Sequence, residues 1–264
     1  MKIFKPKFWN KRYNVFSFIL LPLSLMYMTF ITLKKIVIKS KKFNIPVIVV
    51  GNIFVGGTGK TPLSIFISKE LKNKKTVIIK KYYNEHKDEF SLIKSKSCNL
   101  IHNKDRKLAI KEAERKKFDA VILDDGFQDH SILKNINIIC FNSNQLIGNG
   151  MMLPAGPLRE RMNSLNKAQI IMINGKKNVS FEKKILSISK KIKIYYSKYT
   201  PININEFKKK KLLAFAGIGN PENFFSLLKL NRLNIIKELS FPDHYNYTQN
   251  DLNSLVELEK KYNA

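Results

Sequence analysis

The sequence predicts an α/β fold in which a mainly parallel sheet is covered by helices on both faces. Three observations support this prediction. Short apolar runs typical of buried strands alternate along the chain with stretches whose apolar spacing is typical of helices. A glycine-rich loop joins one such run to a helical stretch, and a later run ends in two aspartates. Because ligands collect at the carboxyl ends of parallel strands, both features are expected on the same side of the sheet.

The first element is an uncharged run of 19 residues, Val15–Leu33, with basic residues on both sides. As one helix it would rise by about 28 Å, close to the roughly 30 Å of bilayer hydrocarbon. Pro22 and several hydroxyl side chains make it less apolar than a typical span. A membrane span, a helix lying in the lipid interface and a buried core helix all stay open. We expect an N-terminal membrane-associated helix within residues 1–40.

The next element is a glycine-rich loop between the apolar run 46–50 and a helical stretch at 60–71. The backbone N–H groups of such a loop, with the helix N-terminus, surround a polyphosphate. Lys60 would reach the β and γ phosphates, and the Thr61 hydroxyl would bind Mg²⁺. Phe54 stands at the first glycine position of the usual motif, so the match is incomplete. The nucleotide-binding residues expected here are Gly56, Gly57, Thr58, Gly59, Lys60 and Thr61.

Together with the strands and helices that follow, this loop predicts a P-loop nucleoside triphosphate hydrolase-like domain over residues 41–182. A lysine-dense connection is expected over 183–211, and a smaller α/β lobe over 212–264. The expected strands are 76–80, 120–123, 136–141 and 170–173, and a charged helix is expected at 105–117.

Carboxylates follow two of the expected strands. Asp124 and Asp125 end one of them, where a P-loop enzyme keeps the carboxylate that supports Mg²⁺. The tight turn that follows would aim Gln128 into the same site. Asp88 and Glu89 close the polar loop after an earlier strand, so they too belong on the ligand side of the sheet. Asp88 and Glu89, taken alone, are more typical of a solvated surface loop, and a solvated turn is the less favoured alternative for Asp124 and Asp125.

Two further residues stand out. A stiff loop rich in glycine and proline, Gly148–Leu158, precedes Arg159, and an arginine held in this way can clamp a phosphate with two hydrogen bonds. His244 lies in the FPDHY segment of the expected smaller lobe. Without other information, such a histidine is more often structural or on the surface.

Composition narrows the classes of partner. The formal net charge of +28 implies an anionic partner, such as nucleic acid, a phosphorylated substrate or an anionic membrane. Part of the lysine excess is equally consistent with the general composition of the genome. No aromatic stacking platform or groove-reading motif accompanies the charge, so we expect no nucleic-acid partner. Cys98 and Cys140 lack metal-ligand spacing and suit a reducing cytosol.

Five separated segments occur in the order GNIFVGGTGKTP, DDGFQDH, GNGMMLPAGPLRE, AFAGIGNPENFF and FPDHYNYT, after the N-terminal ILLPLSLMY. Together they resemble the tetraacyldisaccharide 4'-kinase (lipid A 4'-kinase) family. The resemblance implies an enzyme at the cytoplasmic face of the inner membrane that uses ATP and Mg²⁺. Its acceptor would be the lipid A disaccharide 1-phosphate, phosphorylated at the 4'-hydroxyl to give lipid IVA. Inner-membrane lipid would be a further contact, and no obligate protein partner is implied.

The resemblance also implies roles for individual residues. Asp88 paired with His244 would deprotonate the acceptor hydroxyl, and Arg159 corresponds to the arginine of the LRE motif. The chain departs from the family pattern at Lys80–Asn84, where the family usually has a Ser-Arg-Gly-Tyr-Gly turn. Residues that correspond to the family's metal and phosphate shell are Glu89, Asp124, Asp125 and Gln128.

Two other functions remain open from the residues alone. One is a P-loop kinase or ligase that acts on a soluble metabolite, although the uncharged N-terminal run argues against it. The other is a membrane-bound ATPase switch, in which Lys60 and Asp124 would cycle the nucleotide without any acceptor. A switch has no need of the pair Asp88 and His244, so replacing either residue distinguishes a switch from a kinase.

Overall fold

The centre of the structure is a seven-stranded sheet in which all strands run parallel, as the alternation of elements predicts. The computed structural model describes residues 6–83, 87–242 and 245–263. The strand order is β3-β2-β4-β1-β5-β6-β7, so β1 lies between β4 and β5. The strands are β1 (Val47–Gly51), β2 (Thr76–Lys81), β3 (Leu100–Asn103), β4 (Ala120–Asp124), β5 (Ile136–Asn142), β6 (Ile170–Asn174) and β7 (Lys193–Ser197).

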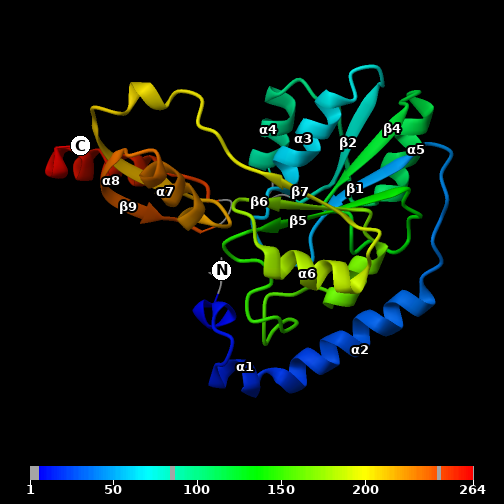
Figure 1. The fold of residues 1–264 in the computed structure, drawn as a ribbon. Helices are drawn as coiled ribbons and strands as arrows, with labels where there is room; N and C mark the ends of the chain where they lie inside the picture. The colour runs from blue at the N-terminus through cyan, green and yellow to red at the C-terminus, as the bar shows by residue number, and fades with distance from the viewer. Residues whose placement is uncertain (1–5, 84–86, 243–244, 264) are drawn as a thin grey trace. The chain divides into compact units, whose positions relative to one another are not determined.

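Helices cover both faces of this sheet (Figure 1). On one face α3 (Lys60–Glu70) and α4 (Lys87–Ser95) pack through Ile65 and Ile93 against Ile78 and Ile122 of the strands. On the other face lie α5 (Arg106–Arg115) and α6 (Val179–Ile188). Because strand side chains alternate between faces, residues two positions beyond Ile78 and Ile122 point to the α3 and α4 side. Those residues are Lys80 and Asp124.

The chain divides into two compact units, Pro6–Lys198 and a smaller one that includes Tyr199–Ala264. The larger unit extends further than the predicted boundary at residue 182. The reason is that β7, which lies within the expected connection 183–211, is an edge strand of the large sheet. The run at 192–197 is strand-like in the sequence, but its lysine-dense surroundings favoured a connection between two lobes. In the structure its side chains alternate between exposed and half-buried, as in an edge strand.

The smaller unit contains a parallel pair of strands, β8 (Lys211–Ala216) and β9 (Asn234–Ser240). Helix α7 (Pro221–Leu230) packs on them through Phe225. Helix α8 (Gln249–Tyr262) begins with a capping box between Thr248 and Asp251. Short 3-10 helices occur at Lys7–Asn10, Met162–Lys167 and Ile204–Glu206.

The uncharged N-terminal run forms two helices, α1 (Val15–Ile19) and α2 (Leu21–Val37), so the expectation of one continuous membrane helix was wrong. Pro22 explains the break, because it lacks the N–H that would continue α1 and its ring is accommodated only in the first turn of a helix. Among the described residues, we find no helix with both the length and the apolar character required to cross a bilayer.

Helices α1 and α2 place their polar side chains toward the protein and their apolar side chains outward. Ser24 Oγ donates to the Met152 carbonyl at 3.0 Å and accepts from the Ala155 N–H at 2.9 Å. Ser17 Oγ accepts from Asn149 Nδ2 at 3.1 Å. This polarity is the reverse of that of a helix packed on a protein core. The exposed apolar residues are Val15, Phe16, Phe18, Ile19, Leu23, Leu25, Met26, Phe30, Leu33, Ile36 and Val37.

Candidate active site

The glycine-rich loop joins β1 to α3, as predicted, at the carboxyl edge of the sheet. Gly56 and Gly59 have backbone φ angles of 113° and 86°, which residues with a Cβ atom rarely adopt. The buried Asn52 also holds the loop. Its Nδ2 donates to Thr58 Oγ1 at 2.9 Å and to the Gly56 carbonyl at 3.3 Å. The path of the loop is therefore determined by the backbone freedom of its glycines and by one buried amide.

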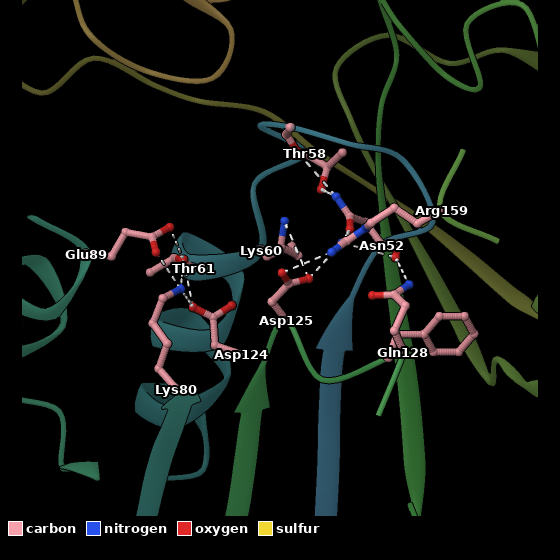
Figure 2. Close-up of polar contacts among 12 residues, drawn as sticks. Asn52, Thr58, Lys60, Thr61, Lys80, Glu89, Asp124, Asp125, Gln128 and Arg159 are labelled. Atoms are coloured by element: carbon pink, nitrogen blue, oxygen red, sulfur yellow. Dashed lines mark hydrogen bonds and ion pairs between the residues drawn. The ribbon is translucent and has the colours of Figure 1, made fainter. Parts of the chain in front are cut away.

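Two cations converge on Asp125 beside this loop (Figure 2). Arg159 Nη2 and Nη1 donate to the two oxygens of Asp125 at 2.8 and 3.2 Å, and Lys60 Nζ lies 3.8 Å from Oδ1. Arg159 Nη2 also donates to Asn52 Oδ1. Burial would raise the pKa of the Asp125 carboxyl, but Lys60 and Arg159 hold it well below its usual value. Lys60 and Arg159 thus form a positive site of the kind that binds phosphate.

A second cluster lies where β2, β4, α3 and α4 meet. Thr61 Oγ1 donates to Asp124 Oδ2 at 2.7 Å and lies 3.2 Å from Glu89 Oε1. Lys80 Nζ lies 2.6 Å from Asp124 Oδ2 and 2.6 Å from Glu89 Oε2. Burial lowers the pKa of Lys80, but the two carboxylates outweigh this effect and raise it above its ordinary value. Lys80 is therefore a charged ammonium at neutral pH (Figure 2).

The oxygens of this cluster fit a magnesium ion. Thr61, Glu89 and Asp124 offer one hydroxyl and two carboxylates, the hard ligands that Mg²⁺ prefers. Asp124 is fully buried, and its Oδ1 has no hydrogen-bond partner among the described residues. In the described part of the chain, no group of three or more His, Cys, Asp or Glu side chains is placed to hold a metal. A P-loop site does not need such a group, because substrate phosphates complete the coordination of Mg²⁺.

The structure brings only some of the predicted site residues together. Gln128 lies on the Asn52 side of the site, where its Nε2 donates to the Asn52 carbonyl at 2.8 Å, and Asp125 faces the two cations (Figure 2). Neither residue joins the cluster of Thr61 and Asp124. Asp88 is exposed in the first turn of α4. His244 lies outside the described residues, so the pairing of Asp88 with His244 stays a prediction.

Three residues with clear places in the site were not predicted from the sequence. Asn52 and Lys80 are two of them, and Glu160 is the third. The buried Glu160 accepts from Lys35 of α2 at 2.5 Å and lies 3.7 Å from His130 Nε2. Burial, together with nearby lysines, lowers the pKa of His130 to about 4 although Glu160 opposes this effect, so the imidazole is neutral at pH 7. Glu160 therefore ties α2 to the loop that carries Arg159.

Comparison with known proteins gives consistent matches. The family model described as Tetraacyldisaccharide-1-P 4'-kinase (LpxK) matches residues 16–264. Tetraacyldisaccharide 4'-kinase of Pelagibacter ubique (strain HTCC1062) is 42% identical over 271 residues, which cover 100% of this chain and 85% of the relative. The protein of the same name from Rickettsia canadensis (strain McKiel) is 36% identical over 283 residues, with coverage of 100% and 85%.

A solved structure shares the fold. It is a crystal structure of LpxK from Aquifex aeolicus in complex with ATP. The TM-score is 0.68 at 24% sequence identity, over 88% of this chain and 84% of the other. This likeness agrees with the arrangement of a glycine-rich loop and a mainly parallel sheet.

Proposed function

The chain belongs to the Tetraacyldisaccharide-1-P 4'-kinase family, and on that premise we propose that it transfers the γ-phosphate of ATP to the 4'-hydroxyl of tetraacyldisaccharide 1-phosphate. The reaction gives lipid IVA in lipid A biosynthesis. The observation that carries the proposal is the position of Lys60 and Arg159 on one side of the loop and of Thr61, Glu89 and Asp124 on the other. Family membership does not favour an ATPase switch without an acceptor.

The chain's own residues have distinct roles in this reaction. The loop amides and Lys60 bind the phosphates, and Arg159 stabilises the charge that develops on the transferred group. Thr61, Glu89 and Asp124 would hold Mg²⁺, which neutralises phosphate charge when it is bound. The loop fixes the position of the γ-phosphate, so that the acceptor oxygen can approach it in line.

The acceptor hydroxyl needs a base, and we assign this role to Asp88 with His244. Replacing Asp88 by asparagine, or His244 by glutamine, is expected to lower lipid phosphorylation by about 10²- to 10⁴-fold, the usual contribution of general-base catalysis. ATP affinity should not change, because neither residue belongs to the loop. The measurement is the rate of labelled lipid formation together with the binding of a fluorescent ATP analogue.

The control for this experiment is Glu112→Gln. It alters a carboxylate of α5 that is paired with Lys116, just beyond the end of that helix. A wild-type rate of lipid phosphorylation in Asp88→Asn and His244→Gln would refute the assignment of the base. ATP hydrolysis without any lipid product in all variants and in the wild type would instead indicate the ATPase switch.

For the location of the enzyme, we propose that the exposed apolar side of α1 and α2 lies in the surface of the inner membrane, on its cytoplasmic face. Eleven large apolar side chains are exposed there, while Ser17 and Ser24 face the protein. Lys34 stands in the last turn of α2, where it can approach anionic headgroups, whereas Lys35 is paired with Glu160. An acylated acceptor stays in the bilayer, because withdrawal costs about 0.8 kcal/mol per CH₂ group. The enzyme therefore has to work at the lipid surface.

Replacing Phe30 and Leu33 together by aspartate is expected to weaken binding to anionic vesicles by about tenfold or more. Each apolar side chain that becomes buried in the lipid contributes roughly 1.5–3 kcal/mol to the free energy of binding. Vesicle flotation with phosphatidylglycerol-containing liposomes measures this effect. Leu230→Asp on α7 is the matched control, since Leu230 is 71% exposed in the smaller unit. Equal flotation of the double variant and the wild type would contradict the proposed membrane surface.

A further inference from the structure

Lys80 is a buried cation within a cluster of oxygens that suits a metal ion. It stands near the end of β2, next to Asp124 in the register of the two parallel strands, and only 4% of its surface is exposed. Its Nζ lies 2.6 Å from an oxygen of Asp124, 2.6 Å from one of Glu89 and 3.4 Å from Thr61 Oγ1 (Figure 2). The ammonium therefore uses the same three side chains that offer oxygen ligands to Mg²⁺.

Electrostatic repulsion favours one cation at a time among these oxygens. Two cations that share these oxygens would lie only a few ångströms apart, where two like charges repel by several kcal/mol at an effective dielectric constant of about 20. The carboxylates of Asp124 and Glu89 in turn are costly to leave unpaired, since Asp124 is fully buried. A lysine can be displaced by a metal ion, because its long flexible stem can move the ammonium while the strand stays in the sheet.

We infer that Lys80 competes with the divalent cation for the oxygens of Thr61, Glu89 and Asp124. Its ammonium holds the two carboxylates together without metal, and a metal ion enters as the ammonium leaves. The inference rests on the proposed function, in which these three residues hold Mg²⁺. It adds that the chain itself sets how readily the metal enters, and that binding of metal and movement of Lys80 are one event.

The test is direct binding of Mn²⁺, followed by the electron paramagnetic resonance signal of the free ion, with no lipid present. Lys80→Met is expected to bind Mn²⁺ about tenfold or more tightly than the wild type in the absence of nucleotide, because a competing charge has been removed. Lys81→Met is the matched control, since the side chain of Lys81 lies over the Tyr83 ring. Unchanged Mn²⁺ affinity in Lys80→Met would overturn the inference.

A second measurement uses the wild-type protein and does not depend on the folding of a variant. Acetylation of lysines by acetic anhydride, read by mass spectrometry, should increase at Lys80 as Mn²⁺ is added, while labelling of Lys81 stays constant. Constant labelling of Lys80 at saturating Mn²⁺ would overturn the inference. Absence of Mn²⁺ binding in every variant, even with ATP, would instead refute the metal site and with it this part of the proposed function.

Discussion

Replacing Lys60 by alanine is expected to lower the rate of γ-phosphate transfer by about 10³-fold or more, the effect of removing a group that stabilises charge mainly in the transition state. Lys60 stands at the start of α3 and its Nζ lies 3.8 Å from Asp125 Oδ1, beside Arg159. Without Lys60, Arg159 is the one remaining cation of this positive site. The measurement is the turnover number with labelled ATP and lipid acceptor in detergent micelles.

Lys69→Ala is the matched control, because Lys69 lies in the last turn of the same helix, away from the loop. It should leave turnover within about twofold of the wild type, as expected for a surface substitution away from the site. Circular dichroism serves to check that both variants are folded. Wild-type turnover of a folded Lys60→Ala variant would mean that the glycine-rich loop does not hold the transferred phosphate.

Replacing Asp124 by asparagine is expected to lower the turnover number by about 10²- to 10³-fold at a fixed Mg²⁺ concentration. The substitution conserves shape but removes the charge that binds Thr61 and Lys80 at 2.7 and 2.6 Å. An amide is also a weaker ligand for Mg²⁺ than a carboxylate. The dependence of turnover on Mg²⁺ concentration should therefore shift to higher concentration, and this shift is measured directly.

The control for Asp124→Asn is Asp119→Asn. Asp119 precedes β4 at the end of the strand remote from the loop, and it accepts a hydrogen bond from the Lys75 N–H at 2.6 Å. This variant can lose some stability, but its Mg²⁺ dependence should match that of the wild type. If Asp124→Asn kept the wild-type Mg²⁺ dependence, the metal would have to bind elsewhere.

The parts of the fold that the sequence predicted well depend on local signals. The glycine-rich loop, the strand that ends in Asp124 and the alternation of strands and helices are each visible in a short window of sequence. The loop rich in glycine and proline ahead of Arg159 was visible for the same reason. For these parts, the register of parallel strands then brings the residues to one edge of the sheet.

Other features depend on contacts between distant segments, which no window of sequence shows. Asn52 holds Arg159, which is 107 positions further along the chain, and Glu160 holds Lys35 across 125 positions. Lys80 was noticed as a departure from a family turn, but its burial between two carboxylates follows only from the pairing of β2 with β4. For the N-terminus, apolar composition suggested a membrane helix. The break follows locally from Pro22, whereas the inward direction of Ser17 and Ser24 depends on packing against the loop ahead of Arg159.

Transfer of labelled phosphate to the lipid decides whether this chain is a kinase for a lipid acceptor. Wild-type protein is mixed with ATP labelled in the γ-phosphate, Mg²⁺ and tetraacyldisaccharide 1-phosphate in detergent micelles, and the lipid is separated and counted. We expect label in the lipid product, in a 1:1 ratio with the ADP formed. Formation of ADP and free phosphate with no labelled lipid, from protein that binds ATP, would contradict the account.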